Sequence, residues 1–467
     1  MPNASIVDLK ASMTTTAPMS KVFGGKDYLA EYDAAAESEK FPLVKRWMEL
    51  EPLPFFDQLR RQRPVLVTPE CTLLALFTDI RDALQMPKIF TVDLYKPKMG
   101  VTTNDPGFMM AHDDNALHDR ERAIMKGMLN RDDIPEIRLL IERVSRRLLK
   151  KAEGELDIVN HYGRIVPAVL VREYFGLDGI DTKKILKWSY WSQYNAFHNQ
   201  PFNLHSPEKF KHIETEQAKC VEEMVSYIKI LLIRKLIAVK TTGRIRELPL
   251  MLSNSLRRLT GKVPKKLKDD IVTRMLRTSF PDNVDFPLDR MGANVGGLLV
   301  GTIETTSQAV TQVIQFFIDR PELMEQAKLA AAQQNADKFD GMVWEALRFV
   351  PISPYLFRQA SEDYIIASGT DRQTTIPEGT NVLMLTQSAM FDEYSYPEPD
   401  QFNAQRNWYH HFNFGFASHD CIGKYIGMVM IPEMVRQVLL LDSLRAVSKM
   451  DYKDGPFPES YHLAWKG

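Results

Sequence analysis

The sequence predicts a mainly α-helical protein with small β-sheets, folded as one large domain. Most segments favour helices, and residues 285–319 form an apolar run too hydrophobic on all sides for the protein surface. Short strand-like segments bounded by proline or glycine, at 64–68 and 363–382, predict only small sheets. No linker, repeat or low-complexity tract separates two cores. Residues 41–467 are therefore expected to form one domain, behind a loose polar N-terminal arm of residues 1–40.

Composition and charge are those of an ordinary globular protein. Of 467 residues, 44% are hydrophobic and 25% are charged, with a formal net charge of -1. This balance gives no reason to expect nucleic acid or an anionic membrane as the main partner. No apolar run approaches the ~20 residues that span a bilayer, so no transmembrane anchor is expected. Cys71, Cys220 and Cys421 are too widely spaced for a disulfide framework, which indicates a reducing, cytoplasmic setting.

Upstream of the apolar core helix, the predicted elements surround one long irregular segment. A strand at 64–68 precedes a helix at 72–84. Residues 86–114 are rich in proline, glycine, methionine and aromatic residues without a helical period, which is typical of a lid over a ligand. A satellite hydrophobic cluster is the alternative. Further helices are predicted at 118–128, 135–149, 161–175, 182–194, 207–239, 340–349 and 425–441.

A strongly basic stretch begins inside the predicted helix at 207–239. Between residues 229 and 268, Glu247 is the one acidic residue. A solvated helix face is the expected role of such a run, and docking of an acidic protein is the alternative. The twelve basic residues are Lys229, Arg234, Lys235, Lys240, Arg244, Arg246, Arg257, Arg258, Lys262, Lys265, Lys266 and Lys268.

Cys421 follows a glycine-containing turn and opens the apolar helix at 425–441. Unpaired N–H groups and the macrodipole at a helix start favour a thiolate over a thiol. Phe414 is placed to shield the sulfur, His419 offers a polar contact, and Gly423 leaves room for a flat group. These are the needs of a thiolate ligand to haem iron.

Two other roles for this cysteine remain open from the residues alone. Buried free cysteine usually behaves as a small hydrophobic residue. A zinc site is the second alternative, although the spacing is poor and no second cysteine pair exists. Its ligands would be His410, His411, His419 and Cys421.

The loop also resembles the cysteine-ligand loop of the cytochrome P-450 superfamily. Ala417 departs from that pattern, since the family usually has glycine there. The resemblance implies an α-rich triangular prism that encloses haem b, with Cys421 as the iron ligand. The residues that match are Phe414, Gly415, His419, Cys421 and Gly423.

Within the apolar core helix, residues 301–306 carry an acid and several hydroxyls. A buried acid is costly unless it is paired or useful. Threonine hydroxyls can bond the carbonyl four residues back, opening the helix and making room for water. The stretch resembles the family's acid–alcohol motif, which implies that Glu304 and Thr305 are catalytic residues delivering protons to dioxygen. Thr302 replaces the usual second glycine and is expected to narrow the oxygen pocket.

Other motifs follow in the order found in the family. His118 and Arg122 share a helical face and resemble the pair that binds haem propionates, as does Arg358. The remaining motif resembles the family's Glu-Arg-Arg triad, which implies a buried ion network that fixes the segment before the cysteine loop. Its members here are Glu345, Arg348 and Arg406.

Candidate pocket residues are mostly apolar, which predicts a small apolar substrate. A strand at 352–357 is expected to line the pocket, and a C-terminal hairpin at 456–465 to reach it. The pocket residues are Phe108, Met109, Met110, Asn294, Leu298, Ile352 and Phe457.

The resemblance implies a monooxygenase that hydroxylates or epoxidises its substrate. Electrons would come from a separate ferredoxin or flavodoxin-type donor with its reductase. A peroxygenase or isomerase that needs no reductase, and a non-catalytic haem-based sensor, remain alternatives. The donor is expected to dock near Arg120, Lys126, Lys424 and Arg436.

Overall fold

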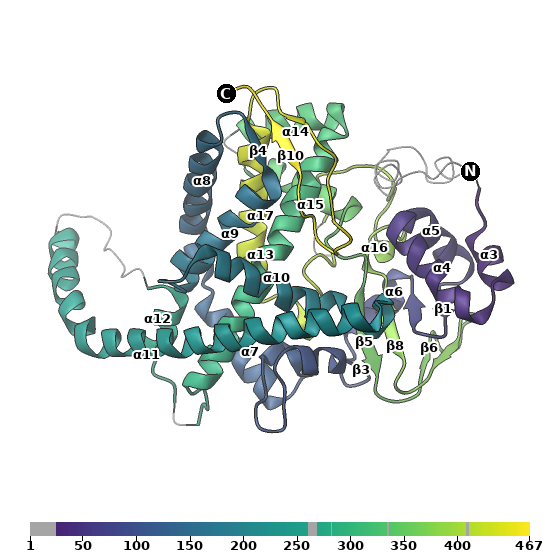
Figure 1. The fold of residues 1–467 in the computed structure, drawn as a ribbon, viewed down its shortest axis with the longest axis horizontal. Coiled ribbons are helices and arrows are strands. Elements are labelled where there is room, and N and C mark those ends of the chain that lie inside the picture. Colours follow the sequence, from purple (N-terminus) through teal and green to yellow (C-terminus); the bar gives the residue numbers. More distant parts are fainter. Residues whose placement is uncertain (1–24, 260–268, 282, 334–335, 408–410) are drawn as a thin grey trace.

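A computed structural model describes residues 25–259, 269–281, 283–333, 336–407 and 411–467. A helical body occupies one side of the molecule, and short strands with N-terminal helices occupy the other (Figure 1). The predicted class, mainly α with small sheets, is confirmed. No helix in the described part of the chain is long and apolar enough to cross a membrane.

The helical body is built around α13, Leu288–Ile318, which corresponds to the predicted core helix. Buried apolar side chains such as Val295, Leu299 and Val310 lie along most of the helix, so other helices enclose it. Pro321 opens the next helix, α14, in the position where proline is favoured. The enclosing helices are α10 Thr182–His198, α11 Pro207–Leu259, α15 Ala336–Phe349 and α17 Lys424–Leu439.

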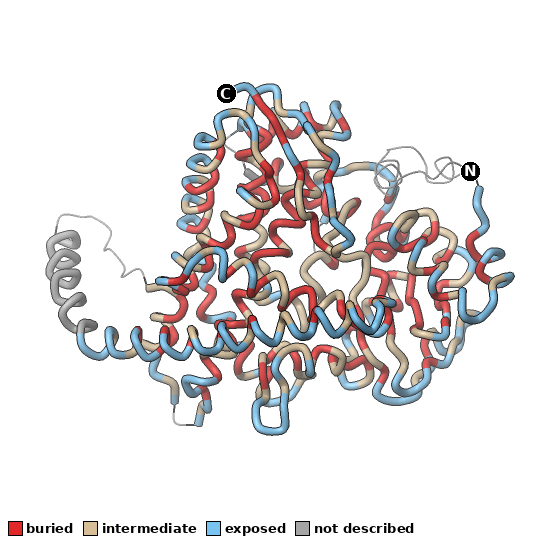
Figure 2. The backbone as a smooth tube through the Cα atoms, viewed as in Figure 1, coloured by how far each residue is buried: buried red, intermediate tan, exposed pale blue. Residues whose placement is uncertain are grey.

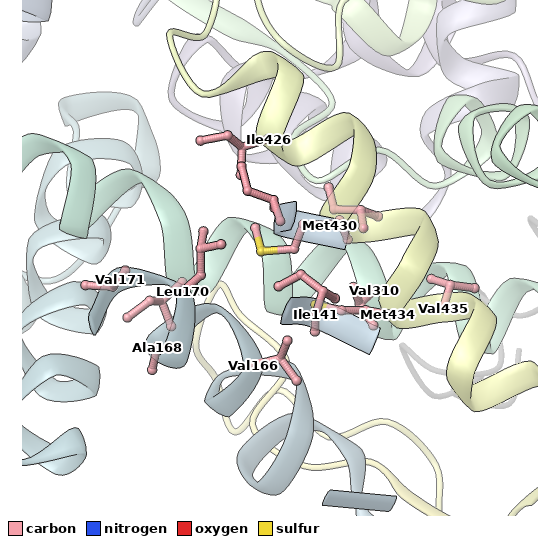
Figure 3. Close-up of a cluster of buried hydrophobic side chains, with 14 of the residues drawn as sticks. Ile141, Val166, Ala168, Leu170, Val171, Val310, Ile426, Met430, Met434 and Val435 are labelled. Carbon is pink, nitrogen blue, oxygen red and sulfur yellow. The ribbon is translucent and has the colours of Figure 1, made fainter. Parts of the chain in front are cut away.

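A second layer of helices completes this core. Figure 3 shows where residues of α8, α9, α13 and α17 meet, with Ile141, Val166, Val310 and Met430 among them. Burial is continuous through the centre of the body (Figure 2). The remaining helices of this body are α7 Ala116–Met128, α8 Ile134–Lys151, α9 Ile165–Leu170, α12 Ile271–Arg277 and α14 Pro321–Ala332.

The largest sheet has five strands in the order β1-β2-β8-β5-β3, and β2 pairs in parallel with β8. The helix predicted at 72–84 is wrong in its first part, because Thr72–Leu74 is strand β2 and only Phe77–Leu84 is helix, α6. All three residues of β2 are buried, and a continuous apolar run does not distinguish a buried strand from a helix. The other strands are β1 Val65–Val67, β3 Phe90–Thr91, β5 Leu356–Ala360 and β8 Asn381–Met384.

Two smaller sheets contain strands from the predicted regions 363–382 and 456–465, but the C-terminal strand pairs only with strands outside 456–465. Tyr364–Ile366 (β6) pairs antiparallel with Thr374–Ile376 (β7). His462–Ala464 (β10) pairs with both Arg445–Ala446 (β9) and Glu155–Asp157 (β4), so the C-terminus closes against the helical body.

Folded structure begins nearer the N-terminus than predicted. Residues 25–40 were expected to belong to a loose arm, yet Tyr28–Ala34 forms helix α3, capped by the Asp27 carboxylate. Residues 1–24 lie outside the described residues. Two further helices, α4 Glu37–Leu50 and α5 Pro52–Gln62, follow. The Tyr28 ring lies 5.4 Å from that of Trp47, and its hydroxyl donates to Glu51 over 2.7 Å.

Tyr28→Ala is expected to lower the free energy of unfolding by about 3–5 kcal/mol, because it empties an aromatic site in the core. Tyr28→Phe keeps the ring and removes only the hydrogen bond, so it should cost about 1–2 kcal/mol. Urea unfolding followed by circular dichroism measures both. Equal, small losses for the two variants would mean that α3 does not pack on the body.

Candidate functional site

Cys421 lies between a tight turn and the start of α17. Its N–H donates to the Phe414 carbonyl over 2.7 Å, which closes the loop. Gly415 has φ +71°, and a Cβ there would approach the His419 carbonyl oxygen to 3.0 Å, so glycine is required. Ala417 has φ +56°, a left-handed conformation that costs a non-glycine residue about 1–2 kcal/mol. The turn thus keeps its geometry at the position where the family pattern has glycine.

The Cys421 sulfur borders an internal space. The residue is exposed, whereas burial by the surrounding protein raises the pKa of its thiol, against the opposing effect of the Gly423 N–H. The exposure of Cys421 and the effect of burial on its pKa are consistent if its exposed surface faces a space inside the protein. In the protein without a bound group, burial and the Gly423 N–H therefore act in opposite directions on this thiol. A cationic partner for the sulfur, such as a metal ion, would reverse this balance.

Phe414 covers the sulfur's side of the loop and packs on Trp344 with ring centroids 5.4 Å apart. A Cβ at Gly427 would come within 2.9 Å of the Phe414 ring, so this glycine admits the phenylalanine. A Cβ at Gly423 would lie 3.7 Å from the sulfur. Packing therefore requires glycine at 427, whereas a Cβ at Gly423, the N-cap of α17, would make only an ordinary contact with the sulfur.

One short face in the middle of α13 is open, between buried stretches of the helix. Gly301 is exposed, and nothing lies within 4 Å of the point where its Cβ would be. The Thr305 hydroxyl donates to the Gly301 carbonyl over 2.7 Å, and the Thr302 hydroxyl donates to Leu298 over 2.6 Å. The predicted back-bonding is thus present. Gln193 of α10 also donates to the neighbouring Val300 carbonyl over 2.7 Å.

Glu304 is buried and forms an ion pair that the sequence did not reveal. Arg164 Nε donates to one of its oxygens over 3.0 Å, and the other has no hydrogen-bond partner among the described residues. Arg164 also lies 3.3 Å from Glu459, in the C-terminal segment. Burial raises the pKa of Glu304 to about 7, and the Arg164 guanidinium opposes that rise. A carboxyl with such a pKa can both give and take a proton near neutral pH.

The two residues predicted to hold propionates at 118 and 122 are buried, with different partners. His118 Nε2 has no hydrogen-bond partner in the described structure. Its Nδ1 lies 3.1 Å from Asp119. Arg122 forms an ion pair with Asp420, next to Cys421 in the chain.

Arg358 and His419 lie near the same place. The His118 and His419 rings are 5.0 Å apart. His419 Nε2 lies 3.5 Å from Asp113, and burial lowers the pKa of His419. Burial also lowers the pKa of Arg358, whose guanidinium donates to its neighbour's carbonyl over 2.7 Å. A group with acidic substituents would supply an acceptor for the His118 Nε2, which has no hydrogen-bond partner among the described residues.

The structure brings the predicted triad together. Arg348 donates to Glu345 over 2.9 and 3.0 Å, and Arg406 donates to it over 3.1 Å. Glu345 and Arg348 have side-chain exposures of 1% and 0%, so each charge depends on its partner. Arg348 also donates to the Pro399 carbonyl over 2.7 Å. The network thus joins α15 to the chain that leads into the cysteine loop.

Phe108 lies against the open helix. A Cβ at Gly297 would come within 2.3 Å of the Phe108 ring, so the ring rests directly on the α13 backbone. Met110 accepts from Arg122, Met109 and Leu298 are buried in the core, and Ile352 accepts from Gln308.

Two residues predicted for the substrate pocket have other partners. Asn294 donates to Glu121 over 2.7 Å, within a buried pair of Glu121 and Arg290. Phe457 packs on the rings of Tyr190 and His198 of α10, in a separate small core. A single sequence gives no signal for either partner. The strand predicted at 352–357 begins only at Leu356.

The predicted electron-donor face is partly occupied by internal contacts. Arg436 donates to two carbonyls at the end of α14, and Lys126 pairs with Asp420 at 3.2 Å. Arg120 and Lys424 are half-buried. The zinc alternative falls partly outside the described residues, at His410. Among described residues, the group that could hold a metal ion excludes Cys421 and comprises Asp114, His118 and His419.

These residues fit a flat, acidic cofactor bound through sulfur. The open Cys421 sulfur and the open Gly301 face belong to regions whose helices, α17 and α13, pack on each other. The partnerless His118 nitrogen and the buried Arg358 offer hydrogen-bond donors for carboxylates. Haem b has this shape and these substituents.

Comparisons with known proteins agree with this fit to haem b. The family model for cytochrome P450 matches residues 78–452. Cytochrome P450 109 of Bacillus spizizenii is 23% identical over 378 residues, 80% of each chain. Steroid C26-monooxygenase of Mycobacterium tuberculosis is 30% identical over 168 residues, 36% of each chain. The structure of CYP109Q5 from Chondromyces apiculatus has a TM-score of 0.68 at 18% identity, covering 89% of this chain and 95% of that one, which shows a shared fold. The chain therefore belongs to the cytochrome P450 family, which uses haem b.

Proposed function

We propose that this P450 monooxygenase inserts one oxygen atom of O2 into an apolar small molecule, with electrons from a separate ferredoxin- or flavodoxin-type donor. The observation that carries the proposal is the Cys421 sulfur, open toward an internal space. Haem b, when bound there, supplies the iron that activates dioxygen. Phe414 keeps water from the sulfur, and His118, Arg122 and Arg358 hold the propionates.

The chain's own part in the reaction is to bring protons to the open face of α13. Glu304 holds a proton near neutral pH at the oxygen that Arg164 leaves free. The Thr305 hydroxyl, anchored on the Gly301 carbonyl, orients the oxygen molecule and passes on the proton. Since Arg164 also lies beside Glu459, this pair is linked to the half-buried C-terminal segment. Proton supply and oxygen binding then depend on two adjacent residues, Glu304 held by Arg164 and Thr305 held by the Gly301 carbonyl.

The substrate is an apolar molecule of the size of a terpenoid, fatty acid, steroid or simple aromatic. Phe108, Met110, Leu298 and Ile352 line its site, and the Phe108 ring lies against the α13 backbone at Gly297. A relative named a steroid C26-monooxygenase supports steroids as one class to test. The family typically takes electrons from redox partners, which supports a separate donor.

The purified haem protein is expected to oxidise at least one compound of such a panel when NADH, a ferredoxin and its reductase are supplied. Binding is measured first, by the shift of the Soret band, and product then by mass spectrometry. Product formed with hydrogen peroxide but not with the donor system would identify a peroxygenase. A Soret shift without product under either condition would identify a ligand-binding protein.

Cys421→Ala is expected to abolish the thiolate-type absorption of the reduced carbon monoxide complex, because the sulfur ligand is lost. Cys220→Ala is the matched control, since Cys220 is buried in the helical core away from the loop. It should leave the spectrum unchanged. An unaltered spectrum in Cys421→Ala would refute the ligand assignment.

Thr305→Ala is expected to keep the haem spectrum and substrate binding but to divert most reducing equivalents to hydrogen peroxide. The reason is that the hydroxyl that passes the proton to the oxygen molecule is lost. Thr302→Ala removes an equivalent back-bonded hydroxyl three positions earlier on the same helix. Its ratio of product to NADH consumed should stay within about twofold of the wild type, less than 1 kcal/mol. Equal coupling in all three proteins would contradict the role of Thr305.

A further inference from the structure

The outward face of α11 carries apolar side chains that the protein leaves uncovered. Ile230, Ile233 and Ile237 are 68%, 55% and 57% exposed. Their spacing of three and four residues places them on one side of the helix. The opposite side of α11 packs on α10 and α13 and buries Ile228 and Leu231. Figure 2 shows α11 crossing the front of the molecule, with exposed residues recurring between buried and intermediate ones along its coloured part.

Basic side chains border this isoleucine stripe, defined as Ile230, Ile233 and Ile237. Lys229 and Lys240 are exposed, and no carboxylate among the described residues lies within 4 Å of either ammonium group. Arg234 is exposed too and pairs with Asp178. The local charge is therefore positive although the whole chain has a net charge of -1. The net charge of the whole chain therefore does not reveal the positive charge around the stripe.

The charges oppose a second copy of the chain as the occupant. In a twofold-symmetric contact centred on the stripe, the same patch meets itself. Lys229 and Lys240 would then face basic groups of the other copy, and like charges at contact distance disfavour association. An occupant with negative charge and an apolar layer satisfies both the lysines and the isoleucines.

We propose that the outward face of α11 binds the surface of a bilayer containing anionic lipids. The isoleucines enter the boundary between headgroups and acyl chains, as the apolar face of an interfacial helix does. Lys229 and Lys240 extend their ammonium groups to lipid phosphates. The surface is separate from the cysteine loop, so the site remains open to its electron donor. An apolar substrate dissolved in the bilayer is brought close to the protein.

Flotation of the purified haem protein with vesicles tests this directly. The protein should float with vesicles of phosphatidylcholine and phosphatidylglycerol, and much less with phosphatidylcholine alone. The triple variant Ile230→Ser, Ile233→Ser, Ile237→Ser should lower the partition coefficient by about tenfold or more, since most of the buried apolar area is lost. The double variant Lys229→Glu, Lys240→Glu should lower it by at least about tenfold, and wild-type binding should weaken as salt is added.

Leu329→Ser is the matched control, because Leu329 of α14 is as exposed as Ile230, at 68%, and lies outside the stripe. It should float like the wild type. The carbon monoxide spectrum checks that every variant keeps its haem site. The proposal is overturned if the wild type does not bind anionic vesicles, or if the triple variant binds equally well. It is also overturned if sedimentation velocity shows a wild-type dimer that the triple variant loses.

Discussion

The structure depends on a requirement that buried carboxylates be paired. Glu345, Glu121 and Glu304 are all nearly inaccessible, and an isolated charge in such a place would cost several kcal/mol. Each is held by at least one arginine from outside its own helix. These contacts fix the segment before the cysteine loop, join α7 to α13, and orient the acid of the open helix face. The pairs are Glu345 with Arg348 and Arg406, Glu121 with Arg290, and Glu304 with Arg164.

The central helix α13 combines two properties that rarely occur together. It is buried on nearly all sides, which gives it a fixed position, yet the Gly301 face is open. Side chains bind the carbonyls of Leu298, Val300 and Gly301, so the local backbone has hydrogen-bond partners other than its own N–H groups. A rigid helix can therefore present polar groups to an internal space without losing its packing.

Features set by local pattern could be predicted from the sequence. The core helix, the threonine back-bonds and the contact of Glu345 with Arg348 depend on residues a few positions apart. Partners far apart in the chain could not, because one sequence does not state that Arg164 reaches Glu304 across 140 positions. Strand β2 was mistaken for helix for a related reason. Its apolar residues are buried on both faces, which removes the alternation that distinguishes a strand.

The contact of Phe108 with Gly297 has a consequence for how the interior communicates with the surface. The Phe108 N–H also donates to the Met99 carbonyl over 3.0 Å, which ties the ring to the base of an exposed loop at 102–105. A ligand that needs the volume of the ring can gain it if the side chain rotates away from Gly297, or if the Phe108 backbone moves. Movement of the backbone would disturb the hydrogen bond to Met99 and shift the exposed loop as well.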